Sequence, residues 1–291
     1  MRTLVLVTII VSIALGWVTR RINETRAQRR LIDSIASAGG TFSFHDDQSP
    51  APLWLQRCFF EEPLRSVRAV FFDFEDHPAV TESDIEVLAG FPQLEELDVA
   101  VCGISGEGLA ALADLRHFTT LDVCHSPLTE AGVRNIGRLQ RLTSLNLTET
   151  GASDDEMRHI AKLSELQWLA IGGNDTTDEG LSHLSGLRRL TYLSLHGLPI
   201  TDEGLRHVGG FNELEHLDLS STKIDGSGLR HLTKCHRLKR LRLINTAIDD
   251  SDLDDVAQLK TLETLALEFT NATQRTIHKL QAALPGCEIV Y

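Results

Sequence analysis

Large apolar residues recur along the chain with a fixed period of 24 residues. Within each unit, positions 1, 4 and 6 are apolar, and a second apolar set falls at positions 16, 19 and 22. The first set alternates like a short strand with one buried face, and the second has the spacing of an amphipathic helix. A period of this length predicts a solenoid of stacked strand–helix units. The eight regular units begin at Leu94, Phe118, Leu142, Leu166, Leu190, Leu214, Leu238 and Leu262.

Polar positions between strand and helix are also regular. Position 12 is Ser, Thr or Asp in all eight units, and these residues are good helix N-caps. Acidic residues such as Asp154 and Asp155 often follow, where the positive end of the same helix is expected to stabilise them. Position 9 is mostly small and polar, and we expect it to bond the backbone of a neighbouring unit. We therefore assign all these positions to the scaffold.

The ends of the repeat region differ from its middle. An irregular first unit begins near Val67 and is three residues longer than the others, with the extra length around residues 73–79. The helix predicted over Leu53–Phe60 can cover the open N-terminal end of the stack. A helix over Ile22–Ala38 is expected to be a juxtamembrane stalk or, alternatively, a helix on the lipid surface. A short strand should follow it, and Cys287–Tyr291 should form a terminal strand.

The N-terminal segment favours a membrane anchor. Leu4–Val18 carry no charge, and five arginines follow within the next twelve residues. By the positive-inside rule, the protein is expected to cross the cell membrane once, with its repeats in the cytoplasm. Export after signal cleavage near Gly16 is the alternative. The predicted domains are an anchor at 1–19, a juxtamembrane helix, linker and cap at 20–66, and the repeats at 67–291.

The net charge limits the kinds of partner that the protein can bind, and the cysteine spacing indicates the state of its thiols. The net charge is −13, but residues 1–60 carry +3, so the remainder carries −16. An acidic body argues against nucleic acid, because phosphate binding needs a basic surface. The five cysteines include no CxxC pair, which predicts reduced thiols, with Cys102 and Cys235 at interior positions.

The pattern LxxLxLxxTxITDEGLxxLxxL resembles the leucine-rich repeat in the form built from a strand and a full helix. It is similar to repeats of ribonuclease-inhibitor-like proteins, to the cysteine-containing repeats of F-box proteins, and to bacterial membrane-anchored proteins with tandem ITDEGL units. This resemblance covers about Val67–Tyr291. It implies an α/β fold, a right-handed leucine-rich-repeat solenoid, here preceded by an N-terminal hydrophobic helix. It also implies protein binding on the concave face. No F-box-like segment precedes the repeats.

Outward-facing strand positions give the candidate binding residues. Position 3 places Trp168, Tyr192, His216 and Arg240 on consecutive predicted strands, and Arg242 lies beside the last of them. Aromatic residues and arginine among small neighbours are typical of a binding hot spot. Asp98 and Asp122 make the other end of this face acidic, so a partner of opposite polarity would be oriented by it. The alternative is a solvated face without a partner.

Sequence motifs for chemistry are missing from the chain. It contains no HExxH, no GxSxG and no glycine-rich phosphate loop. We therefore predict a non-catalytic, membrane-tethered module for protein–protein interaction, without cofactor, metal or small-molecule substrate. The alternatives are a structural or envelope-associated scaffold, and an adaptor of the F-box substrate-receptor type that lacks the F-box.

Overall fold

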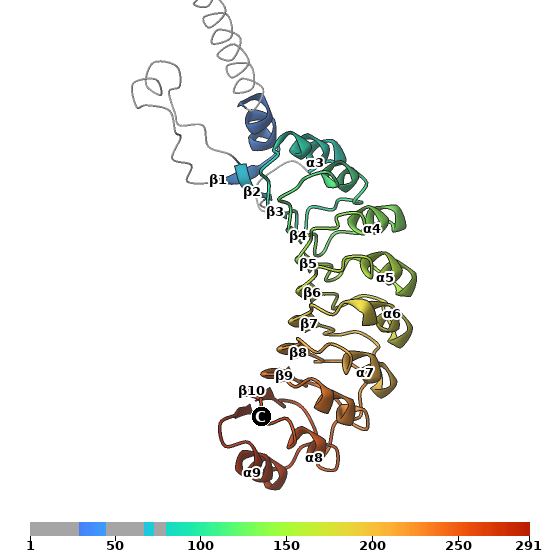
Figure 1. Cartoon of the computed structure of the whole chain (residues 1–291), viewed down its shortest axis with the longest axis vertical. Helices are drawn as coiled ribbons and strands as arrows, with labels where there is room; N and C mark the ends of the chain where they lie inside the picture. Colours follow the sequence, from blue (N-terminus) through green and yellow to red (C-terminus); the bar gives the residue numbers. More distant parts are fainter. Residues whose placement is uncertain (1–28, 45–66, 73–79) are drawn as a thin grey trace, which may run out of the picture.

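The computed structural model describes residues 29–44, 67–72 and 80–291. Its strands form one sheet of 11 strands in chain order, which follows the curve of the molecule (Figure 1). The strands are β1 (Gly40–Phe44), β2 (Val67–Phe72), β3 (Glu96–Asp98), β4 (Thr120–Asp122), β5 (Ser144–Asn146), β6 (Trp168–Ala170), β7 (Tyr192–Ser194), β8 (His216–Asp218), β9 (Arg240–Arg242), β10 (Thr264–Ala266) and β11 (Glu288–Val290).

Strand register confirms the repeat period. From β3 onward each residue pairs in parallel with the residue 24 positions later, as in Glu96 with Thr120. Ala69 of β2 pairs with Glu96, 27 residues later, which confirms the longer first unit. Its extra residues, 73–79, lie outside the described ranges. The predicted terminal strand is confirmed as β11, and β1 pairs antiparallel with β2.

One helical segment or more returns each unit to the next strand on the convex side, opposite the strands (Figure 1). The α-helices are α3 (Glu82–Val87), α4 (Glu130–Ile136), α5 (Asp154–Ile160), α6 (Asp178–His183), α7 (Asp202–Val208), α8 (Leu253–Val256) and α9 (Gln274–Ala283). The 3₁₀ segments are η1 (Leu88–Gly90), η2 (Gly108–Leu112), η3 (Leu184–Gly186) and η4 (Leu229–Lys234). The described helices are short, ten residues at most.

The prediction of a full helix in every unit is wrong. Two units have a 3₁₀ segment instead, because Gly106 and Gly226 at position 13 adopt φ values of 86° and 109° and cannot continue a helix from position 12. The N-cap is confirmed at five of the eight position-12 residues, for example Thr177 and Thr201. It is wrong for the other three, Ser105, Asp225 and Asp249.

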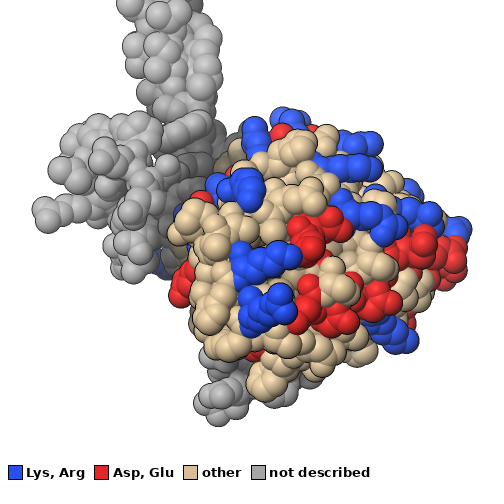
Figure 2. All heavy atoms as spheres, turned by 90° about the horizontal axis from the view of Figure 1, so that it is seen from below, with Lys and Arg blue, Asp and Glu red and all other residues tan. Residues whose placement is uncertain are grey.

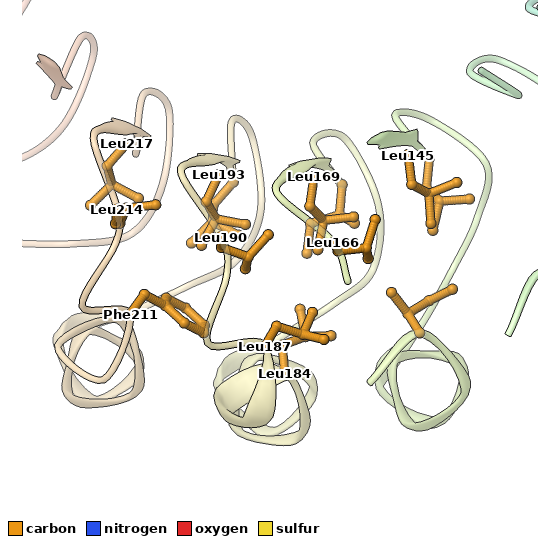
Figure 3. Packing of buried hydrophobic residues seen from close by; sticks show 14 of the residues in the cluster. Leu145, Leu166, Leu169, Leu184, Leu187, Leu190, Leu193, Phe211, Leu214 and Leu217 are labelled. Atoms are coloured by element: carbon orange, nitrogen blue, oxygen red, sulfur yellow. The ribbon is translucent and has the colours of Figure 1, made fainter. Parts of the chain in front are cut away.

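A continuous apolar core lies between strands and helical segments. Leu190, just before β7, and Leu193, within it, point toward Leu184 and Leu187 on the helical side, and all four are fully buried (Figure 3). Phe211 takes the position of Leu187 in the following unit and is also fully buried. Each such side chain stabilises the stack by about 1.5–3 kcal/mol relative to leaving it exposed. The predicted strand and helix stripes are therefore confirmed as the two sides of one core.

The N-terminal end of the core is covered by a helix over residues 29–37 and by β1. The turn that follows this helix contains Gly39, whose φ is 89°. Ile35 is fully buried, and Leu31 packs so close to Gly90 that a Cβ there would lie 2.4 Å from its Cδ1. Phe42 of β1 meets Phe91 edge to face. These residues form a cap, so the expected stalk or lipid-surface helix does not extend through residues 29–37.

Two further predictions for the N-terminal part of the chain concern residues that the structure does not describe. The anchor at 1–19 and the helix at Leu53–Phe60 lie outside the described ranges. No helix within residues 29–44, 67–72 and 80–291 is long and apolar enough to cross a membrane.

Carboxylates at position 13 join each unit to the next. Asp154 accepts hydrogen bonds from the Thr177 amide at 2.7 Å, the Thr177 hydroxyl at 2.8 Å and the Gly180 amide at 2.8 Å. We call the acids that make this contact the carboxylate ladder: Glu82, Asp154, Asp178, Asp202 and Asp250. Four of these acids lie in the first turn of their own helix, as the sequence predicted for such positions. Their oxygens also accept from the amides at the start of the next unit's helical segment, a role that the sequence analysis missed.

Position 9 also bonds between units, as predicted, although less generally. The Asn174 side-chain oxygen accepts from the amides of Thr150 and Gly151, at 2.9 and 2.8 Å, and its amide nitrogen donates to the Leu147 carbonyl at 2.7 Å. Most threonines in this column bond a carbonyl of their own unit instead; Thr222 donates to Leu219 at 2.7 Å. The inter-unit role is therefore strongest where the side chain is an amide with both donor and acceptor.

Candidate functional site

Three rings stand in line on consecutive strands of the concave face. Trp168, Tyr192 and His216 occupy the same register position on β6, β7 and β8. The Trp168 and Tyr192 rings stack with centroids 4.7 Å apart and planes 9° apart, and His216 follows at 6.2 Å from Tyr192. Arg240 continues the line on β9. We call these four residues the concave ladder; the structure brings them together as the sequence predicted.

The rings of the concave ladder are half-buried and uncharged near neutral pH. Burial, followed by the charge of Asp218, raises the pKa of the Tyr192 hydroxyl. Burial, followed by the charge of Arg240, lowers the pKa of the His216 imidazole. The positive charge of this site therefore comes from arginine, and the rings offer partly exposed apolar surface.

Small residues surround the rings. Ala170 and Ser194 lie beside Trp168 and Tyr192 on the same strands and are buried. Gly172, Gly173 and Gly197 follow where these strands end, and the last two adopt φ values of 66° and 70°. Because these neighbours carry little or no side chain, the outer edges of the rings remain open to a partner.

Beyond the rings the face is basic. Arg240 and Arg242 are both exposed on β9. Arg242 lies 3.6 Å from the Asp218 carboxylate, whereas Arg240 has no ion pair with any described residue. Seen from the C-terminal end, lysine and arginine side chains lie interspersed with acidic ones (Figure 2). An unpaired Arg240 beside the rings is thus available to a carboxylate of a partner.

Asp98 and Asp122, predicted as partner-binding acids, have a structural role. Each accepts a hydrogen bond from the amide two residues later, Ala100 and Cys124, at 2.9 Å, which forms the turn that ends the strand. Asp122 also accepts from the Asn146 side chain at 2.9 Å. They lie on β3 and β4, so β5 separates them from the ring-bearing strands. The structure does not bring these acids into the concave ladder.

The turn after each strand repeats a backbone feature that the sequence did not reveal. Position 8 has a φ between 54° and 70° in all eight regular units, although only two of them have glycine there. The other six residues are Val101, His125, Glu149, Ser221, Asn245 and Phe269. Their only shared property is the backbone conformation, and that is why a comparison of residue types missed it. Phe269 is 85% exposed, so no packing explains its position.

The described cysteines are free thiols, while Cys58 lies outside the described residues. Cys235 is buried as predicted, and burial raises its pKa to about 11. Cys102, also predicted to be interior, is only half-buried. Among the residues that the structure describes, no group of three or more His, Cys, Asp or Glu side chains could hold a metal ion.

Comparison with known proteins supports the repeat assignment. The family described as Leucine Rich repeat matches residues 92–113 and 213–232. Among curated proteins, none matches the sequence. The structure of internalin C2 from Listeria monocytogenes is similar, with 26% identity and a TM-score of 0.57, and the match covers 71% of this chain and 81% of that one.

Two further solved structures have the same fold. Internalin F from Listeria monocytogenes is 23% identical with a TM-score of 0.52, covering 71% of this chain and 70% of its own. A leucine-rich-repeat protein of Leptospira interrogans is 21% identical with a TM-score of 0.56, and the match covers 71% of this chain and 57% of that one.

Proposed function

Because the chain is a leucine-rich-repeat protein, a fold that serves as a scaffold for protein–protein interaction, we propose that it binds a protein partner through the concave ladder. Binding requires no catalysis in this proposal. The partner presents apolar or aromatic side chains to the rings of Trp168 and Tyr192 and a carboxylate to Arg240. Aromatic residues and arginine supply most of the energy at such interfaces.

The observation that carries the proposal is that the repeat does not need these residues. In other units, position 3 holds small side chains, among them Thr120, Ser144 and Thr264. Since those units stack without large side chains here, the half-exposed stack of Trp168 on Tyr192 is not required for the packing of the repeat. Asp98 and Asp122, by contrast, are explained by their turns, so the proposal assigns them at most a long-range electrostatic role.

The experiment replaces the concave ladder with the residues that other units use. In the variant Trp168→Ser, Tyr192→Thr and Arg240→Thr, the strands keep side chains already found at this position. Proteins crosslinked to the variant in cells are compared with those crosslinked to the unchanged chain. We expect the concave partner to be lost, because three such residues together contribute several kcal/mol at hot spots, about 2 kcal/mol or more each.

A matched control changes three exposed arginines on the helical side, Arg134→Ser, Arg206→Thr and Arg275→Thr. This control should retain the partner. If the ladder variant crosslinks the same proteins as the unchanged chain, the concave proposal is wrong. That result would favour a scaffold that assembles others through its flanks.

A membrane tether belongs to the same proposal. Its support is the uncharged run Leu4–Val18 with arginines after it, which favours an anchor whose repeats face the cytoplasm. A reporter fused after Tyr291 tests the side of the membrane, and an exported reporter would overturn it. A purified chain that begins at Trp17 would exclude the anchor.

A further inference from the structure

A second site lies apart from the concave face, at the edge where the first two regular units return to their next strands. The segments after η2 and α4 enclose a pocket of about 210 Å³ there. Its apolar lining includes Leu112, Phe118 and Leu139, which are nearly fully buried and belong to the core. The half-buried Ala113 and Leu115 pack against this core and present the accessible apolar surface of the pocket. The pocket therefore has a rigid apolar floor, because these side chains are held by the stacking of the units.

Three arginines form the rim of this pocket. Arg116, Arg138 and Arg141 are exposed, and Asp114 is the one acid among the lining residues. The lining thus carries a net positive charge of two, on a body whose residues after 60 carry −16. A local positive potential on an acidic protein attracts anions selectively to this place.

In later units, arginines along the same edge of the solenoid form ion pairs. Arg189 pairs with Glu165, and Arg237 pairs with Glu213, each acid lying 24 residues earlier in the preceding unit. The residue 24 positions before Arg141 is His117, so this pairing is lost. Within the described ranges, no side chain or carbonyl forms an ion pair or hydrogen bond with the Arg116, Arg138 or Arg141 guanidinium. The three guanidinium groups around the pocket therefore form no ion pair with a described side chain, and Asp114 offsets only one of their charges.

We propose that this arginine pocket binds an organic phosphate. Guanidinium groups bind phosphate oxygens with two parallel hydrogen bonds, and three of them can surround a dianionic group. The apolar floor contacts the organic part, so a phosphate ester binds better than inorganic phosphate. The ester is a soluble metabolite or a phospholipid headgroup, since both present the same group. This site is independent of the concave ladder.

The test uses the full chain in an uncharged detergent, with calorimetric titration of three probes: inorganic phosphate, phenyl phosphate and dihexanoyl phosphatidic acid. The variant Arg116→Gln, Arg138→Gln and Arg141→Gln removes the rim. The control Arg134→Gln, Arg158→Gln and Arg206→Gln removes the same charge from exposed helical arginines that form surface ion pairs. Circular dichroism checks that both variants are folded.

We expect phenyl phosphate to bind more tightly than inorganic phosphate. The rim variant should lose about tenfold or more in affinity, since a hydrogen bond to a charged group contributes about 1.5–3 kcal/mol. The control should change affinity by about twofold at most, as expected for screened surface charge. Arg141→Lys keeps the charge but not the paired donors, and should weaken binding less than Arg141→Gln.

Binding of phenyl phosphate alone supports a soluble ester, and binding of phosphatidic acid, with or without phenyl phosphate, supports a lipid headgroup. The proposal is overturned if neither ester binds, or if the rim and control variants weaken binding equally. The concave variant Trp168→Ser, Tyr192→Thr and Arg240→Thr should leave ester binding unchanged. Failure of either proposed site is thereby distinguished from failure of the other.

Discussion

Asp154 and Asp155 begin the same helix, but only Asp154 is bonded to the next unit. Asp154 accepts from the Thr177 amide and hydroxyl and from the Gly180 amide, at 2.7–2.8 Å. The side chain of Asp155 is 78% exposed and lies 3.4 Å from Arg158. The substitutions Asp154→Ala and Asp155→Ala therefore separate bonding between units from stabilisation at a helix N-terminus.

The expected free energies of unfolding differ clearly. Asp155→Ala loses a helix-end interaction of about 0.3–1 kcal/mol and a surface ion pair of at most about 0.5 kcal/mol. Asp154→Ala loses a similar helix-end interaction and also leaves the two amides without their acceptor. Losing an N-terminal acceptor costs about 1 kcal/mol, and hydrogen bonds to a carboxylate contribute about 1.5–3 kcal/mol before exposure reduces them. We expect a loss of about 2–3 kcal/mol for Asp154→Ala and less than about 1 kcal/mol for Asp155→Ala.

Native-state amide exchange is the direct assay, because a solenoid can open locally without unfolding as a whole. In Asp154→Ala the protection of the Thr177 and Gly180 amides should fall, and urea unfolding should shift to lower concentration. In Asp155→Ala these two amides should keep their protection. The reasoning is refuted if the two variants lose stability equally within about 0.5 kcal/mol, which is the usual error of additivity.

Other predictions concern single residues. Val101→Asn should raise the free energy of unfolding by about 0.5–1 kcal/mol, since Val101 has a φ of 59° and asparagine tolerates this region better. A lower midpoint in urea unfolding would contradict this expectation. Burial raises the pKa of Glu82, but the Gly108 and Ser105 amides and the Ser105 hydroxyl lower it more. Ionised Glu82 therefore stabilises the fold in full above its unfolded pKa of 4.5, and this stabilisation is lost as the pH falls through the lower pKa of the folded state. Over that pH range, protection of the Gly108 amide should fall in the unchanged chain but stay constant in Glu82→Gln. Burial raises the pKa of Cys235 from 9.0 to about 11. Alkylation of Cys235 at pH 8, measured for each cysteine by mass spectrometry, should therefore be about 100-fold slower in the folded protein than in the urea-unfolded protein. Equal rates would exclude a buried thiol.

The columns of the repeat predicted the fold because each column repeats one physical requirement. Leu193 and Leu184 were assigned to opposite sides of one core from spacing alone, and both are fully buried. The failures have local causes. Glycine at position 13 was visible at Gly106 and Gly226, but its left-handed backbone is a matter of tertiary geometry. The Asp178 carboxylate at a helix start could bond either its own helix or the next unit, and in the structure it accepts from the Thr201 amide of the next unit.

The candidate sites were also predicted only in part from the repeat pattern. Trp168 and Tyr192 share a column, so the period alone placed them on neighbouring strands. The stacking of their rings and the turn formed by Asp98 depend on side-chain geometry that the pattern does not contain. The arginine pocket was missed because Arg116, Arg138 and Arg141 come from three different columns and two units. No column-by-column comparison can bring them together.

A residue in a repeat is informative when its unit departs from what its neighbours do with the same position. Trp168 departs because it places a large aromatic ring where the preceding unit has Ser144. Arg141 departs because the residue 24 positions before it is His117, whereas the corresponding residue for Arg189 is its partner Glu165. The two departures lie on different faces, one on the strands and one at the edge where helices return. Since stacked units contact only their neighbours, a ligand at the edge of the first two regular units need not disturb strands β6 to β9. Simultaneous occupation of both sites, without mutual displacement, is therefore what this architecture predicts.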